Sequence, residues 1–99
     1  MLERNFRAPC GEIDIIAEKD GTMVFVEVKL ASEGSATMAW EKIGRTKQRR
    51  IAATAAAYLS ARPFPGFCRF DVAVVRGCPG AFTVEYLEDA FRCGGGFTV

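Results

Sequence analysis

The fold of this chain is decided by Gly11-Glu12-Ile13-Asp14-Ile15-Ile16 and Phe25-Val26-Glu27-Val28-Lys29. Both stretches are rich in Ile and Val and alternate between apolar and polar residues, which is typical of β-strands. Asp20-Gly21 lies between them. Asp-Gly between two such runs favours a tight hairpin, because a type I′ turn needs positive φ at both central residues. The sequence therefore predicts an antiparallel hairpin.

The turn also sets the register of this hairpin. With Asp-Gly at its centre, Asp14 lies directly opposite Glu27, and Glu12 lies directly opposite Lys29. Side chains alternate between the two faces of a strand, so these four residues are expected to share one face. The other face is then apolar and is expected to pack on the core. It carries Ile13, Ile15, Ala17, Val24, Val26 and Val28.

Two opposed carboxylates are costly for a hairpin, and the cost points to a ligand. At about 5 Å and an effective dielectric constant of about 20, they repel each other by roughly 3 kcal/mol. A divalent cation would remove that repulsion, and Mg²⁺ is commonly held by one or two carboxylates while it keeps several waters. Two acids and a lysine around Mg²⁺ suit metal-assisted phosphodiester hydrolysis. The alternative is an exposed sheet face whose charges are simply solvated.

The motif resembles a known nuclease signature. Asp14, followed on the next strand by Glu27-Val28-Lys29, is similar to the PD-(D/E)xK pattern, most closely that of archaeal Holliday-junction resolvases. The whole chain is identified as a member of the uncharacterised YraN-like family of bacterial proteins. The matching blocks are Arg4–Arg7, Gly11–Ala17, Val24–Lys29, Lys47–Leu59, Cys68–Val72 and Glu88–Phe91.

This resemblance implies an activity and a role for each motif residue. The activity would be Mg²⁺- or Mn²⁺-dependent endonucleolytic cleavage of DNA, with branched DNA as one candidate substrate. Asp14 and Glu27 would bind the metal together with the backbone carbonyl of Val28. Lys29 would assist the attacking water or the transition state, and Glu12 would hold a water outside the ligand set. A homodimer is implied as well, because resolvases of this type cut paired strands.

Two departures from the family pattern favour a different function. Such proteins usually begin with a helix that carries a further acidic residue, whereas this sequence starts at Met1-Leu2-Glu3, so that helix is expected to be absent. Leu30-Ala31 follows the motif lysine, where the family usually has Arg or Thr. The alternative function is therefore a nucleic-acid-binding or assembly module that keeps the nuclease fold without turnover.

Charge is distributed unevenly along the chain. Residues 1–40 hold seven acids and four bases, whereas residues 41–69 hold seven bases and one acid. Lys47, Arg49 and Arg50 fall in the first turns of a predicted helix, where cations oppose the helix dipole. We expect these three residues to bind nucleic-acid phosphates beside the acidic metal site. The alternative is a solvated helix face.

The remaining elements complete an α/β pattern. A short helix is expected over 38–43, and a main helix over 47–61 with Thr46 as its N-cap and Pro63 after its end. Apolar residues at helical spacing should face the sheet: Ile51, Ala55, Tyr58 and Leu59. Strands are expected over 69–76 and 81–87. Because a right-handed β-α-β crossover joins parallel strands, the second hairpin strand should run parallel to the strand at 69–76.

The predicted fold is therefore a mixed β-sheet flanked by helices, and by resemblance it is restriction-endonuclease-like. Asp71 lies in an otherwise apolar strand and needs a partner, for which Arg69 or a basic residue of the helix would serve. We favour a structural ion pair there over an active-site role. Trp40 and Tyr58 could stack on bases, but core packing is favoured for both.

Bulk properties point to one domain, expected over 1–92, with a flexible tail over 93–99. No apolar run is long enough to span a membrane, and the N-terminus lacks a signal-peptide pattern. The four cysteines are widely spaced and histidine is absent, which argues against a zinc site and against a disulfide framework. Reduced thiols fit a cytoplasmic protein without membrane partners.

Overall fold

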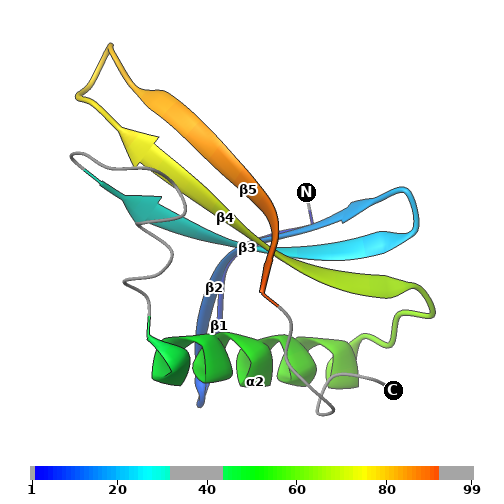
Figure 1. Cartoon of the computed structure of the whole chain (residues 1–99). Helices are drawn as coiled ribbons and strands as arrows, with labels where there is room; N and C mark the ends of the chain where they lie inside the picture. Colours follow the sequence, from blue (N-terminus) through cyan, green and yellow to red (C-terminus); the bar gives the residue numbers. More distant parts are fainter. Residues whose placement is uncertain (1, 32–43, 92–99) are drawn as a thin grey trace.

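The sheet and the helix that crosses it are seen in a computed structural model that describes residues 2–31 and 44–91. The five strands lie in the order β1-β2-β3-β4-β5, with β3 and β4 parallel and the other neighbours antiparallel. This confirms the predicted α/β class and the predicted parallel pair. The elements are β1 (Glu3–Ala8), β2 (Gly11–Lys19), β3 (Thr22–Leu30), α2 (Arg45–Ala61), β4 (Phe67–Arg76) and β5 (Thr83–Phe91) (Figure 1).

The hairpin of β2 and β3 has the predicted register. Lys19 pairs with Thr22, and the ladder continues to Ile15 opposite Val26. Asp20 and Gly21 have φ of 50° and 76°, as the Asp-Gly turn requires. The regular β2–β3 pairing ends at Ile15 and Val26, one residue pair before Asp14 and Glu27.

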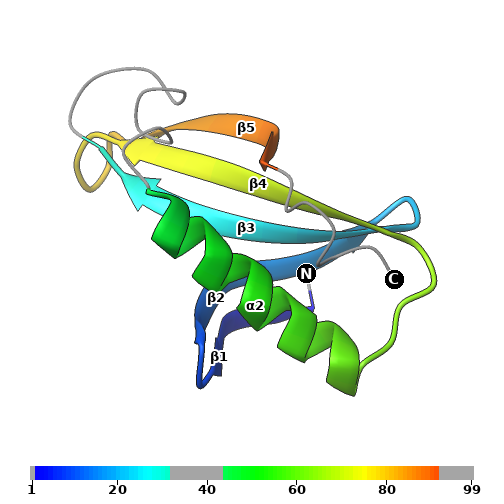
Figure 2. The ribbon, with the colours of Figure 1, turned by 60° about the horizontal axis from the view of Figure 1, so that its bottom comes forward.

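The main core lies between α2 and the β1–β2–β3 side of the sheet (Figure 2). It joins Ile51, Ala55 and Tyr58 of the helix to Met23 and Phe25 of β3. The helix residues therefore face the sheet as predicted, and Tyr58 is a core residue rather than a stacking platform. The prediction that the charged face lies away from the core is wrong, because α2 packs across the face that carries Phe25 and Glu27.

Strand β2 does not keep a strict two-residue alternation. Ile13 and Ile16 both pack in the helix-side core, whereas Ile15 packs with Val24 and Val26 on the opposite face. The predicted single apolar face is therefore wrong for Ile13. The irregularity falls at Asp14, whose carboxylate accepts a hydrogen bond from the backbone N–H of Val28 where the regular strand pairing has ended.

The ends of α2 differ slightly from the prediction. The helix begins at Arg45 with Gly44 as N-cap, and no side chain caps it, so the prediction of Thr46 as N-cap is wrong. It ends at Ala61, and the Arg62 N–H still bonds to the Tyr58 carbonyl. The predicted short helix at 38–43, Trp40 and the tail 93–99 lie outside the described residues.

Strand β1 was not predicted, and β4 and β5 are longer than the expected strands. Phe6 of β1 packs edge-on against the Tyr58 ring at 5.1 Å, which ties this edge strand to the helix. Within residues 2–31 and 44–91, no helix is long and apolar enough to cross a membrane. Cys10, Cys68 and Cys78 are free thiols, as expected for the described cysteines.

Candidate active site

A buried carboxylate on β3 forms the centre of the site. Glu27 exposes only 7% of its side chain, and Lys47 Nζ lies 2.6 Å from its Oε2. Lys47 comes from the first turn of α2, which crosses this face of the sheet. Glu27 therefore faces the helix and shares that face with Phe25, two residues earlier on the strand.

Asp14 is brought next to Glu27 across the hairpin. Its Oδ2 accepts a hydrogen bond of 2.8 Å from the Val28 backbone N–H, which fixes the carboxylate against β3. This donor is neutral, so it orients Asp14 without balancing its charge. Among residues 2–31 and 44–91, no ion pair to Asp14 is formed. The predicted neighbourhood of the two acids is present, although it arises where the regular ladder ends.

The surroundings of Glu27 disfavour the ionised form of its carboxyl group. Burial raises the pKa of Glu27 above its ordinary value, and the neighbouring Asp14 carboxylate raises it further. The Lys47 ammonium acts in the opposite direction but does not outweigh them. A carboxyl group whose pKa is shifted by both burial and a specific charged neighbour is a candidate functional-site residue.

The other two motif residues lie apart from each other. Lys29 is half-buried and follows Glu27 by two residues on β3, so strand alternation puts it on the same face. Glu12 is bound by Arg7 of β1, with Arg7 Nε 3.1 Å from Glu12 Oε2. The predicted ladder pair of Glu12 and Lys29 is absent, because the β2–β3 ladder stops at Ile15 and β1 presents Arg7 to Glu12.

These donors suit a Mg²⁺ or Mn²⁺ ion that keeps water ligands, rather than a metal ion enclosed entirely by protein ligands. The described part of the chain contains no group of three or more His, Cys, Asp or Glu residues that could hold a metal. Asp14 and Glu27 supply two hard carboxylates, and the Val28 carbonyl follows Glu27 directly in the chain. Mg²⁺ accepts this kind of ligand set, since it completes its octahedron with water and substrate oxygens.

The three predicted phosphate-binding residues are all exposed on the first turns of α2. Lys47 is engaged with Glu27, so its first contact is with the candidate metal site. Arg50 lines an open cavity beside the β1–β2 turn. Arg49 is exposed on the helix. Their binding of nucleic-acid phosphates stays a prediction.

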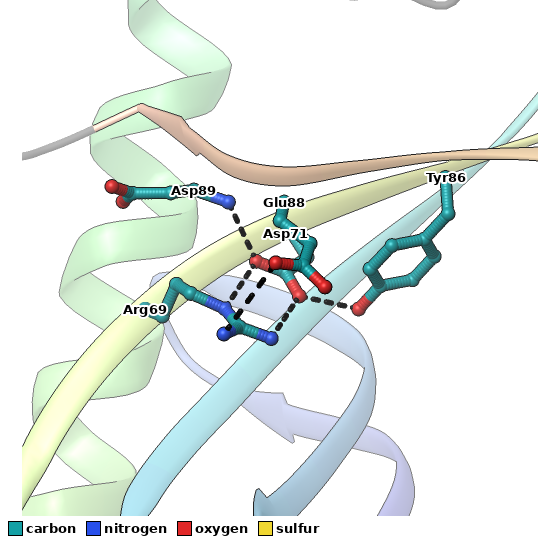
Figure 3. Close-up of polar contacts among 5 residues, drawn as sticks. All are labelled: Arg69, Asp71, Tyr86, Glu88 and Asp89. Atoms are coloured by element: carbon teal, nitrogen blue, oxygen red, sulfur yellow. Dashed lines mark hydrogen bonds and ion pairs between the residues drawn. The ribbon is translucent and has the colours of Figure 1, made fainter.

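A second buried carboxylate, Asp71 of β4, has a different environment (Figure 3). Arg69 donates to both of its oxygens, with Nε at 2.9 Å and Nη2 at 3.0 Å. The Tyr86 hydroxyl and the Asp89 backbone N–H donate to it at 2.5 Å and 2.9 Å. The predicted structural ion pair with Arg69 is confirmed. Burial, together with the Asp71 carboxylate, raises the pKa of Tyr86.

Asp71 lies on the face of the sheet opposite Glu27. Its neighbour Ala73 packs with Val24 and Val26, whereas Phe70 packs in the helix-side core. The two donors from β5 were not predicted: Tyr86 falls inside the expected strand over 81–87 but was not paired with Asp71, and Asp89 lies beyond the expected end of that strand. A register shift between Phe70 and Val72 accompanies this end of β5.

The chain is similar to proteins of one family. Residues 1–75 match the model described as "Uncharacterised protein family UPF0102". A UPF0102 protein of Gloeobacter violaceus is 41% identical over 100 residues, covering 96% of this chain and 79% of that protein. Relatives in Paracidovorax citrulli and Verminephrobacter eiseniae are 42% and 48% identical, covering 95% and 93% of this chain. The chain spans 70% and 65% of the lengths of those two relatives.

Proposed function

The chain belongs to the uncharacterised protein family UPF0102, and from its candidate site we propose that it is a Mg²⁺- or Mn²⁺-dependent nuclease that hydrolyses DNA phosphodiesters. Family membership agrees with the YraN-like resemblance found in the sequence. One observation carries the proposal: the Asp14 carboxylate lies beside Glu27, which is buried on β3, and burial together with Asp14 raises the pKa of Glu27 although Lys47 is in contact.

Each residue of the motif has a defined part in this proposal. Asp14, Glu27 and the Val28 carbonyl would hold the cation, which would supply a Lewis acid and an activated water. Lys29, on the same face, would place its ammonium near the scissile phosphate and stabilise charge that develops on its oxygens. Lys47 would give up part of its contact with Glu27 and become available to a phosphate. Glu12 is held by Arg7 and remains outside the ligand set.

A restriction-endonuclease-like core is part of the same proposal. Its support is the arrangement of the motif: two acids meet across a β-hairpin, the next strand in the sheet is parallel, and a basic helix covers the face. A homodimer is proposed only for cleavage of a branched substrate, which offers two paired strands.

A second function, nucleic-acid binding without turnover, is favoured by the Lys47 contact. At 2.6 Å from Glu27 Oε2, the ammonium already supplies a positive charge where a metal would bind. In that case the two acids and Lys47 form a fixed polar cluster, and the basic helix binds phosphates without chemistry. The two functions differ in one respect that is easily measured, which is metal-dependent cleavage.

The test is a cleavage assay with linear, flapped and four-way DNA in Mg²⁺ or Mn²⁺, with EDTA as the blank. We expect the wild type to cleave at least one substrate and Glu27→Gln to lose both cleavage and metal affinity. The matched control is Glu18→Gln, an exposed acid on the same hairpin, which should cleave like the wild type. Cleavage by Glu27→Gln at the wild-type rate would contradict the assigned site. A wild type that binds DNA but cleaves none of the panel would favour the second function.

A further inference from the structure

An open cavity of about 620 Å³ lies where the β1–β2 turn meets α2. It is lined by residues 7–12 and by Arg50 of the helix. None of the proposed metal ligands lines it. Arg7, Arg50 and Glu12 are its charged side chains, so it contains two guanidinium groups and one carboxylate.

The turn is held closely against the helix at this position. Gly11 has a φ of 153°, and a Cβ there would lie 3.1 Å from Thr54 Oγ1 and 3.6 Å from Arg50 Cβ. Cys10 Sγ lies 3.5 Å from Thr54 Oγ1, which in turn donates to the Arg50 carbonyl at 2.7 Å. Glycine permits both the backbone angle and the close approach. The backbone of Arg50 is therefore held close to the β1–β2 turn.

The charges of the cavity favour a phosphate. Arg7 pairs with Glu12, but their side chains are 80% and 49% exposed, and exposed ion pairs are typically worth less than about 1 kcal/mol. In the described part of the chain, Arg50 has no carboxylate partner. Guanidinium groups bind phosphate oxygens in a bidentate manner, so an incoming phosphate can replace Glu12 on Arg7 and also engage Arg50.

The cavity lies close to the candidate metal pair. Glu12 lines it and lies two positions before Asp14 on β2, which is a rise of roughly 7 Å along a strand. A nucleic-acid strand that presents one phosphate to Asp14 and Glu27 can therefore place a neighbouring phosphate in the cavity.

We propose that Arg7 and Arg50 form a binding site for a backbone phosphate adjacent to the scissile one. This rests on the proposed function for the identity of the ligand as nucleic acid, but it requires no metal and no cleavage. Glu12 occupies Arg7 in the free protein and is released when the phosphate binds. The site also gives Arg7, on the unpredicted strand β1, a role in substrate binding.

The test measures binding of a fluorescent 20-base-pair DNA duplex in EDTA by anisotropy at several salt concentrations. Arg7→Gln and Arg50→Gln should each weaken binding on the order of fivefold to tenfold at 0.1 M salt and lower the salt slope by about one. Glu12→Gln should strengthen binding, because it removes the competing carboxylate. The control is Arg4→Gln, an exposed arginine of β1 outside the cavity, which should leave the slope unchanged.

The site would be overturned if both arginine variants kept the wild-type DNA affinity and salt slope. It would also be overturned if Arg4→Gln lost as much DNA affinity as they do. Weaker binding in Glu12→Gln would overturn it too, because Glu12 would then support the cavity rather than compete for it. Melting curves of each variant confirm that the fold is kept. If the arginine variants lose binding while the wild type fails to cleave in Mg²⁺ or Mn²⁺, the phosphate site stands and the nuclease fails. If they bind normally while the wild type cleaves, the nuclease stands and this site fails.

Discussion

Glu27 and Asp71 are buried carboxylates on the parallel neighbours β3 and β4, but their surroundings differ. Asp71 receives hydrogen bonds from a bidentate arginine, a tyrosine hydroxyl and a backbone N–H. Glu27 has one half-exposed lysine and is crowded by Asp14. The carboxylate of Asp71 therefore has a hydrogen-bond donor on each oxygen and a paired positive charge. At Glu27, burial and Asp14 disfavour the ionised carboxylate more than Lys47 favours it. This difference separates a structural carboxylate from a candidate site, although both lie in apolar strands.

The largest expected effect is on the structural side of this comparison. Asp71→Asn removes the buried negative charge that pairs with Arg69, so we expect a loss of about 3–5 kcal/mol in the free energy of unfolding. Urea denaturation measures it. Glu12→Gln is the control, because it breaks an exposed ion pair and should cost less than about 1 kcal/mol. Equal losses in the two variants would mean that the Asp71 network does not support the fold.

The next effect is on chemistry, at the Glu27 side. Lys29→Ala leaves the three proposed metal ligands in place, so metal and DNA binding should be kept. Turnover should fall on the order of 10²–10³-fold, because the ammonium acts as charge develops on the phosphate. Single-turnover cleavage with saturating enzyme measures this loss separately from binding. A Lys29→Ala variant that cleaves as fast as an active wild type would remove Lys29 from the mechanism.

The smallest effect is the pH dependence of stability that Glu27 contributes. Its pKa is raised in the folded state above the ordinary value of 4.5, so the folded protein holds this proton more tightly than the unfolded chain does. The wild type should therefore lose stability relative to Glu27→Gln as the pH rises from about 4.5 through the raised pKa. Below that window the penalty is absent, because the carboxyl is protonated in both states.

Thermal melting of the two proteins across that range, in EDTA, checks the sign. If the wild type instead became more stable than Glu27→Gln as the pH rises, the effect of Lys47 on the pKa of Glu27 would outweigh those of burial and Asp14. Metal binding should show the opposite trend, because ionised carboxylates are required. Stabilisation by Mg²⁺ should therefore increase across the same window.

Local signals in the sequence were sufficient for the hairpin and the helix, and the right-handed β-α-β crossover between them and the next strand predicted the parallel pair. Asp20-Gly21 sets the turn by backbone chemistry alone, and the register that follows from it holds from Lys19 to Ile15. The spacing of Ile51, Ala55 and Tyr58 likewise identifies the buried side of α2. These features depend on residues that are close in the chain.

The features that sequence reasoning missed depend on distant contacts. β1 has Phe6 as its main apolar residue and no β-branched side chain, so it lacks a strand pattern. Ile13 changes face next to Asp14, whose carboxylate accepts the Val28 N–H, and Lys47 pairs with Glu27 where α2 crosses the charged face. These contacts form between residues that are far apart in the chain, so a short stretch of sequence does not predict them.

The most direct test of the central claim is the effect of Mn²⁺ or Mg²⁺ on the melting of the wild type and Asp14→Asn. The asparagine oxygen can still accept the Val28 hydrogen bond, while the charge beside Glu27 is removed. We expect free metal at ten times its Kd to stabilise the wild type by about 1.4 kcal/mol. Asp14→Asn should be slightly more stable without metal and should not respond to it. An equal metal response in the two proteins, or a markedly less stable metal-free variant, would contradict the account.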